Sequence, residues 1–333
     1  MQPSSIRVLS GDIGGTKTRL AIMNMDGGKL HIAREKTYAS RAYALFEALL
    51  SEFLQGAEIP TRAAFGIAGP VQGRVALTTN LPWRIDADAL QNQFGFDHCA
   101  LLNDLEATAN GLPALNDEDL LTLHVGTAND TGKIISNAAV IAAGTGLGEA
   151  GLCWDGQRYH SFATEGGHVS FSPGNDLEIA LLRYLQQRHE HVSWERIVSG
   201  PGLVNLHGFL GQHRNATLPG WLQHEMQQGD AAAVITAAAL SERDELCVET
   251  LDWFVRLYGA EAGNLALKVM SRGGLYLGGG IAPKILPRLQ SGIFLEAFFN
   301  KGRMRPLLEL MPVKVILNDR TPLYGAALHA LKG

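Results

Sequence analysis

Two segments of the chain share one pattern: an apolar strand, a short turn rich in glycine and threonine, and a second apolar strand. The first runs from Ile6 through the turn GGTKT to Asn24, and the second is NAAVIAAGTGLGEAGLCW at 137–154. The residues after the glycines have no helical period in either segment, so each predicts a β-hairpin rather than a strand that leads into a helix. We therefore expect an α/β fold with mixed sheets.

The segments after the two hairpins are also similar. After the first come a strand-like piece at 29–38, an amphipathic helix at 44–56 and a buried strand at 63–68 that ends in GPVQG. After the second, a helical stretch at 245–270 leads into the strand GLYLG and then GGGIAPK. The repeated order predicts an internal duplication, with two similar α/β domains facing a cleft, where ligands usually bind.

A chain of 333 residues is long enough for two packed cores. We expect a smaller N-terminal α/β domain at 1–112, completed by a C-terminal helix at 321–333. A larger C-terminal α/β domain is expected at 113–320. The polar, turn-rich stretch 116–133 is expected to be a connection at a domain edge.

Composition narrows the classes of partner. A net charge of −5 and a pI near 6.1 give no field that would attract nucleic acid or an anionic membrane. Three widely spaced cysteines indicate reduced thiols, and the N-terminus has neither a signal peptide pattern nor a membrane-spanning run. The sequence therefore predicts a cytoplasmic protein that binds small molecules, with no nucleic acid and no membrane as partner.

The first hairpin turn carries Asp12, Gly14, Gly15 and Thr16. Its backbone N–H groups can bind phosphate oxygens, and the aspartate at the end of the strand can hold water around Mg²⁺. A tight hairpin turn without a ligand is the alternative. The P-loop pattern is rejected, because Thr16 replaces its second glycine and a strand, not a helix, follows.

Two further glycine clusters are candidates for nucleotide binding. The second hairpin turn carries Gly144, Thr145, Gly146 and Gly148, and a strand-like segment follows it, so a second phosphate-binding hairpin fits better than a dinucleotide fingerprint. Gly279, Gly280 and Ile281 follow the strand GLYLG, where glycines can admit a flat nucleobase. Close packing of a helix on a strand is the alternative for this last cluster.

Asn103 and Asp104 stand between an apolar strand and an alanine-rich helix. Asp104 can act as the general base that accepts a proton from a sugar hydroxyl, with Asn103 orienting the same substrate. An aspartate at such a junction is also a common helix N-cap, and this alternative stays open.

Acceptor-rich residues also gather further along the chain. Glu165 and His168 flank two glycines in EGGH, and a turn there can point both side chains at a ligand with several hydroxyls. Zinc binding is disfavoured, because neither HExxH nor a cysteine cluster accompanies them. His168 can instead be structural. Glu195, shortly before SGPG, is either a further ligand residue or a solvated helix residue, and SGPG itself can begin a helix.

Taken together, these motifs resemble the bacterial glucokinase family, within the actin/hexokinase/Hsp70-type ATPase superfamily. The resemblance runs over nearly the whole length, through GDIGGTKTRLAI, LLNDLEATANGL, AAGTGLGEAGL, EGGHVSF, HVSWERIVSGPGLVNL, EAGNLAL and GGGIAPK. It implies two duplicated ribonuclease-H-like domains, with mixed βββαβα sheets facing a central cleft, as in the actin-like ATPase fold. It also implies transfer of the γ-phosphoryl group of ATP to glucose.

The resemblance assigns a role to each candidate. Asp104 would be the catalytic base, and the glucose hydroxyls would be held by Asn103, Glu165, His168 and Glu195. The ATP phosphates would lie on Gly14, Gly15, Thr16 and the segment from Gly144 to Gly148, the adenosine beside Gly278 to Ile281, and Mg²⁺ near Asp12 through water. A homodimer is expected on the same ground.

Two alternatives remain open. One is a kinase for mannose, N-acetylmannosamine or fructose, and the other is a non-catalytic regulator that binds sugar or ATP. The related repressor/ORF/kinase family carries a zinc motif of the form CxCGxxGC and, in its repressors, an N-terminal helix-turn-helix. This sequence has neither, which disfavours zinc dependence and DNA binding.

Overall fold

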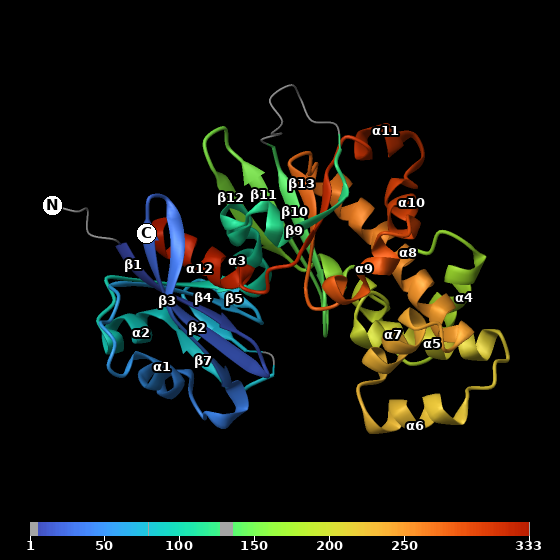
Figure 1. The fold of residues 1–333 in the computed structure, drawn as a ribbon, viewed down its shortest axis with the longest axis horizontal. Helices are drawn as coiled ribbons and strands as arrows, with labels where there is room; N and C mark the ends of the chain where they lie inside the picture. The colour runs from blue at the N-terminus through green and yellow to red at the C-terminus, as the bar shows by residue number, and fades with distance from the viewer. Residues whose placement is uncertain (1–5, 79, 127–135, 333) are drawn as a thin grey trace. The chain divides into compact units, whose positions relative to one another are not determined.

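The computed structural model describes residues 6–78, 80–126 and 136–332 (Figure 1). The chain divides into two compact units. Unit 1 comprises Met1–Leu120, Asp155–Ala163 and Asn318–Gly333, and unit 2 comprises Leu121–Trp154 and Thr164–Leu317. The segment Asp155–Ala163 therefore clusters with unit 1, whereas the sequence placed it in the larger domain.

Unit 1 is built on a five-stranded mixed sheet. Its strand order is β3-β2-β1-β4-β8, and the strands are β1 (Ile6–Ile13), β2 (Lys17–Asp26), β3 (Lys29–Ala39), β4 (Arg62–Ile67) and β8 (His98–Asn103). β1 and β2 form the predicted antiparallel hairpin, while β4 runs parallel to both β1 and β8. A small second sheet contains β5 (Val71–Gln72), β6 (Val75–Leu77) and β7 (Arg84–Asp86).

Helices cover both faces of the five-stranded sheet. They are α1 (Phe46–Leu54), α2 (Ala87–Phe94), α3 (Asp104–Gly111) and α12 (Thr321–Lys332), with short 3₁₀ helices at Ser40–Ala42, Leu112–Ala114 and Asp117–Asp119. Neighbouring residues of β1 point to opposite faces of the sheet, and helices bury both faces. Leu9 packs in a core with Phe46 of α1, whereas Val8 packs in a second core with Leu323 of α12.

The C-terminal helix approaches α3 closely because both helices carry glycine at the contact. A Cβ atom on Gly325 of α12 would overlap the carbonyl oxygen of Ala107. One on Gly111 of α3 would overlap that of Thr321. The last helix of the chain is thus a structural part of unit 1.

Unit 2 contains a larger mixed sheet. It includes, in this order, β11 (Leu147–Trp154), β10 (Ala138–Ala143), β13 (Gly274–Gly278), β14 (Val313–Ile316) and β9 (Leu120–His124). β10 and β11 form the second predicted hairpin, and β10, β13 and β14 run parallel. As in unit 1, an antiparallel hairpin is followed by parallel strands on the other edge of its first strand. Most of β12 (Tyr159–Thr164) belongs to the segment that clusters with unit 1.

One prediction for this part of the chain is wrong. Leu120–His124 forms strand β9 in the sheet, where the sequence predicted a polar connection over 116–133. The strand is short and has polar neighbours on both sides, which conceals its apolar residues Leu121 and Leu123. Residues 127–133 lie outside the described ranges.

Helix α8 (Glu245–Val269) is the central helix of unit 2. The other helices are α4 (Asp176–Gln186), α5 (Gly200–His213), α6 (Gly220–Gln228), α7 (Ala231–Leu240), α9 (Leu286–Leu289), α10 (Ile293–Phe299) and α11 (Arg305–Leu308). Four 3₁₀ helices are η4 (Gly166–His168), η5 (Trp194–Arg196), η6 (Ala282–Ile285) and η7 (Gly302–Met304).

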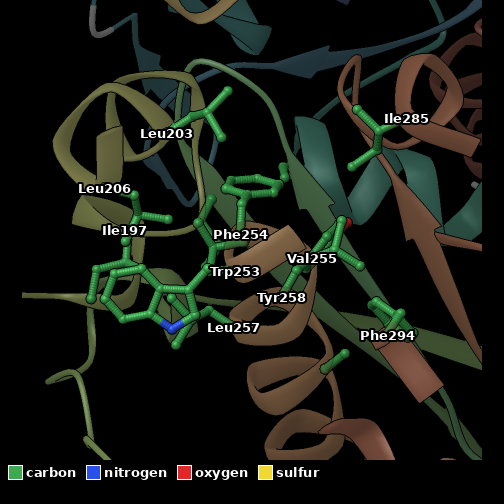
Figure 2. Packing of buried hydrophobic residues seen from close by; sticks show 14 of the residues in the cluster. Ile197, Leu203, Leu206, Trp253, Phe254, Val255, Leu257, Tyr258, Ile285 and Phe294 are labelled. Carbon is green, nitrogen blue, oxygen red and sulfur yellow. The ribbon is translucent and has the colours of Figure 1, made fainter. Parts of the chain in front are cut away.

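Buried side chains surround α8. Figure 2 shows Ile197, Leu203 and Leu206 on one side of this helix, and Ile285 and Phe294 on the other. Tyr258 of α8 meets Phe294 edge to face, with ring centroids 5.6 Å apart. Charged residues recur along α8, and among the described helices none combines the length and apolar content needed to cross a bilayer.

Candidate functional site

In unit 1, the predicted catalytic residues lie at one edge of the sheet. β1, β4 and β8 run in the same direction, and their register aligns Asp12 with Gly66 and Gly66 with Leu102. The residue after Leu102 is Asn103, which ends β8, and Asp104 begins α3. Asp12 and the pair Asn103–Asp104 are therefore at the same end of neighbouring strands, where ligands bind in open α/β sheets.

The charge of Asp12 is unfavourable in this position. Burial and the Asp104 carboxylate raise the pKa of Asp12 to about 6, against a smaller opposing effect of Arg19. Asp319 raises the pKa of Asp12 further, although its own charge is balanced by Arg19, whose Nη2 lies 2.8 Å from its Oδ2. A group of carboxylates like this one fits a bound cation.

The junction of β8 and α3 fixes Asp104. Asn103 is the N-cap of α3, since its Oδ1 accepts a hydrogen bond of 3.0 Å from the Leu105 N–H. Asp104 occupies the first helical position and is half-buried, and its Oδ1 lies 3.0 Å from the same nitrogen. On β4, Gly66 leaves room for the helix, because a Cβ there would lie 2.7 Å from Cβ of Ala107. The capping role left open for Asp104 thus belongs to Asn103.

The first hairpin turn is held by Ser40, which sequence reasoning missed. The Gly14 N–H donates to the Lys17 carbonyl at 3.0 Å, which closes the turn. The Ser40 hydroxyl donates to the Gly14 carbonyl at 2.7 Å, and the Ser40 N–H donates to the Thr16 carbonyl at 3.0 Å. Gly15 packs against Asn80, where a Cβ would come within 2.6 Å of Cβ of Asn80. This turn therefore has a fixed backbone, as a phosphate-binding turn requires.

In unit 2, three segments meet at the second hairpin turn. The Gly144 N–H donates to the Gly146 carbonyl at 2.8 Å, and the Gly200 N–H at the start of α5 donates to the Gly144 carbonyl at 2.8 Å. The Ile281 N–H donates to the Ala143 carbonyl at 3.2 Å, which brings the loop after β13 to the same place.

The other predicted nucleotide-binding residues of these segments differ in exposure and in the space around their backbone. Thr145 is exposed at the tip of the turn, and Gly148 pairs with Ala142 inside the hairpin. Gly279 has a φ of 78°, and a Cβ on it would overlap the Ala143 carbonyl oxygen, so glycine is required there. A Cβ on Gly280 would meet nothing within 4 Å, so this position has open space beside it.

Glu195 connects the hairpin turn to the acceptor-rich residues. Its Oε2 accepts a hydrogen bond of 3.0 Å from the Leu147 N–H, and a Cβ on Gly146 would overlap that oxygen. Glu195 lies in η5, not in a solvated helix, and its side chain is 28% exposed. Ser199 caps α5 by accepting from the Gly202 N–H, so SGPG is the start of a helix.

His168 lies between two glutamates. Its Nδ1 is 3.4 Å from Oε2 of Glu165, and its Nε2 is 3.6 Å from Oε1 of Glu195. The Glu165 and His168 side chains are 78% and 60% exposed, so both remain accessible to a ligand. The structure thus brings together the three residues predicted to bind hydroxyl groups in this unit.

A separate group of potential metal ligands lies elsewhere in unit 2. His207, Asp244 and Cys247 place one ligand atom each within 4.8 Å of one another, and His207 Nε2 is 3.7 Å from Cys247 Sγ. Burial lowers the pKa of His207 and raises the pKa of the Cys247 thiol to about 12, so both are neutral near pH 7. The group is explained without a metal: Asp244 is the N-cap of α8, and the neutral Cys247 thiol contacts the neutral His207 imidazole. The spacing of these residues in the sequence did not reveal the group.

The sequence missed three side chains beside the predicted site: Ser40, Asp319 and Glu149. Ser40 and Asp319 are far along the chain from the motifs that they contact, so no local pattern marks them. Glu149 did carry a signal, because a glutamate in the middle of an apolar strand is unusual.

Comparisons with known proteins show which family the whole chain matches. A family model described as Glucokinase matches residues 9–333. The glucokinase of Nostoc punctiforme is 43% identical over 341 residues, covering 98% of this chain and 99% of that protein. The crystal structure of glucokinase from an Antarctic psychrotroph has a TM-score of 0.86 at 31% identity, covering 98% of this chain and 99% of that one.

A more distant solved structure shares the fold. It is a ROK family glucokinase from Streptomyces griseus in complex with glucose and AMPPNP, with a TM-score of 0.64 at 22% identity, covering 98% of this chain and 100% of that one.

Proposed function

Because the chain belongs to the glucokinase family, we propose that it transfers the γ-phosphoryl group of ATP to the 6-hydroxyl of D-glucose, giving glucose 6-phosphate and ADP. One observation carries the proposal: Glu195 contacts both the hairpin turn, through Leu147, and the hydroxyl-binding candidate His168. The Glu195 side chain thus links the proposed phosphate-binding turn to a residue proposed to bind the sugar.

Asp104 is the proposed general base. Its carboxylate accepts the proton of the 6-hydroxyl as the new oxygen–phosphorus bond forms, and the bond between the γ-phosphorus and the bridging oxygen breaks to release ADP. Its position at the start of α3, fixed by the Asn103 cap, supports this role.

The proposed sugar ligands are Asn103, Glu165, His168 and Glu195. Carboxylates accept hydrogen bonds from hydroxyl groups, while the amide and the imidazole can donate as well as accept. The 3.4 Å and 3.6 Å contacts of His168 with its two glutamates support a shared site in unit 2. We propose that Asn103 serves the same sugar.

The proposed nucleotide ligands are the two hairpin turns and the loop after β13. The phosphates are assigned to Gly14, Gly15, Thr16, Gly144, Thr145, Gly146 and Gly148, and the adenosine to Gly279, Gly280 and Ile281. The fixed backbone of both turns supports the assignment, as does the open space at Gly280. The Streptomyces griseus relative was solved with AMPPNP, an analogue of ATP.

Mg²⁺ is proposed beside Asp12. Bound Mg²⁺ would offset the charge of the β- and γ-phosphates. The residues fit this ion, since Asp12 faces Asp104 and Asp319 and would gain from a cation nearby. Asp12 would accept hydrogen bonds from the water around the ion.

The proposal extends to architecture and setting. We propose that the two units are duplicated ribonuclease-H-like domains of the actin-like ATPase fold, which the matching hairpin and parallel-strand arrangement of the two sheets supports. We also propose a cytoplasmic homodimer. Three free cysteines support a reducing compartment, and light scattering with size exclusion would test the dimer.

The experiment is a measurement of ADP release from MgATP against glucose, mannose, N-acetylmannosamine, fructose and no sugar. We expect turnover to be led by glucose and to be absent without sugar. Turnover led by another sugar would reassign the substrate. If no sugar supported turnover while glucose still raised the melting temperature, a binding role would replace the kinase.

A further inference from the structure

A pair of buried glutamates lies beneath the turn that carries Glu165 and His168. Glu149 on β11 is 2% exposed, and Glu261 on α8 is 0% exposed. Their side chains are within hydrogen-bonding reach of each other. Within the described residues, Oε1 of each glutamate has no hydrogen-bond donor. Two buried carboxyl groups within hydrogen-bonding reach of each other can share one proton, which lets one of them donate to the other.

The surrounding charges do not remove the need for that proton. Lys268 Nζ lies 3.6 Å from Glu261 Oε1, too far for a hydrogen bond, and half of the Lys268 side chain is exposed. Asn264 donates to Glu261 Oε2 at 2.7 Å. Lys301, whose charge also faces the pair, donates to Asn264 and to the Ala260 carbonyl. Burial, and then the charge of Glu261, raise the pKa of Glu149 to about 8.

The turn rests directly on Glu149. A Cβ on Gly166 would overlap Oε2 of Glu149, so the backbone of the turn contacts this carboxyl group. Thr164 adds a second link, because its hydroxyl donates to the Glu149 carbonyl at 3.0 Å and accepts from the Gly166 N–H at 3.2 Å. The position of Glu149 therefore sets the position of the turn.

We propose that Glu149 and Glu261 form a proton-sharing carboxyl pair that holds the Gly166–His168 turn in place, and with it the side chains of Glu165 and His168. Both glutamates are positioning residues. The proposal rests on the proposed function, since Glu165 and His168 of this turn are the side chains proposed to bind glucose. When the shared proton is lost, the two carboxylates repel each other and the turn moves away from β11.

The first test compares glucose kinetics of the wild type, Glu149→Gln and Glu261→Gln from about pH 6.5 to 9. Glutamine keeps the size and can donate the hydrogen bond that the shared proton supplies. We expect the wild-type KM for glucose to rise several-fold toward high pH, with kcat changing less, and the KM of both variants to stay nearly constant. The exposed Glu190→Gln is the control and should follow the wild type. Identical pH profiles in the wild type and in both variants would overturn the positioning role.

The second test contains no sugar. Between the ordinary glutamate pKa of 4.5 and about 8, the folded pair keeps a proton that the unfolded chain releases, so this pair makes the wild type less stable as pH rises. The urea midpoint of Glu149→Gln relative to the wild type should therefore increase with pH. A constant difference would overturn the pair itself. Absence of glucose turnover in the wild type would overturn the proposed function and the positioning role, while the urea comparison still decides on the pair.

Discussion

At the level of single residues, the proposed chemistry depends on two aspartates at one edge of the unit 1 sheet. Asp104 owes its place to the Asn103 cap and to the missing side chain at Gly66. Asp12 is held near Asp104 by the parallel register of β1, β4 and β8. A carboxylate whose negative charge is unfavourable in the free protein, as that of Asp12 is, is typical of a functional site.

Asp104→Asn should separate binding from catalysis. The amide keeps the shape of the side chain but cannot accept the proton, so we expect kcat to fall roughly 10²–10⁴-fold. The dissociation constant for glucose, measured by calorimetry, should change little. The control is Asp88→Asn, an exposed aspartate paired with Arg74 on the surface, which should keep wild-type turnover. Wild-type kcat in Asp104→Asn would rule out the assigned base.

Asp12→Asn should stabilise the protein near neutral pH while impairing turnover. The folded-state pKa of Asp12 is raised from 3.8 to about 6, so the stability linked to its protonated form is lost as pH rises through this window. A neutral asparagine avoids that loss, which amounts to up to about 3 kcal/mol. Melting curves should show a clear gain for Asp12→Asn near pH 7.5 and little gain near pH 4. An equal gain at both pH values would contradict this electrostatic cause.

At the level of elements, the two hairpins are the parts that the sequence predicted best. Their strands are rich in apolar residues, and glycine marks the turns, so the local sequence pattern was sufficient to predict them. Strand β9 was missed because it is short, lies between polar residues, and has as its neighbour in the sheet β14, which is far away in the sequence. Ser40 was missed because its hydrogen bonds to the turn join segments that no local pattern connects.

Two glycines of the second turn should respond differently to alanine. A Cβ on Gly146 would overlap the Glu195 carboxylate, whereas a Cβ on Gly144 would meet nothing within 4 Å. We expect Gly146→Ala to lower the free energy of unfolding by about 1–3 kcal/mol, and Gly144→Ala to leave it nearly unchanged. Urea unfolding of both variants measures the difference. Equal losses would mean that the turn, rather than the Glu195 contact, is sensitive to substitution.

For the chain as a whole, the first strand and the last helix belong to the same unit. Helix α12 packs against β1 through a core that contains Val8 and Leu323. A C-terminal helix that completes the smaller domain was expected, although composition and periodicity do not say which sheet a distant helix covers. No pattern in the sequence indicated that Asp155–Ala163 belongs to unit 1. Long-range packing of this kind is decided by complementary surfaces rather than by local pattern.

Gly325→Ala tests the packing of α12. The added Cβ would overlap the Ala107 carbonyl of α3, so we expect a loss of about 1–3 kcal/mol in the free energy of unfolding. Gly220→Ala is the matched control, since Gly220 is also in a helix and a Cβ there would meet nothing within 4 Å. It should be neutral or slightly stabilising. Calorimetric melting of both variants gives the comparison, and a neutral Gly325→Ala would contradict the close contact.

The identity of the reaction product is the decisive measurement. Phosphorus NMR of a mixture of the wild-type protein, MgATP and glucose should show ADP and a phosphate monoester on the 6-oxygen of glucose, formed in equal amounts. Asp104→Asn should form neither at a comparable rate. Release of ADP with inorganic phosphate alone, or a monoester at another sugar position, would contradict the proposed transfer.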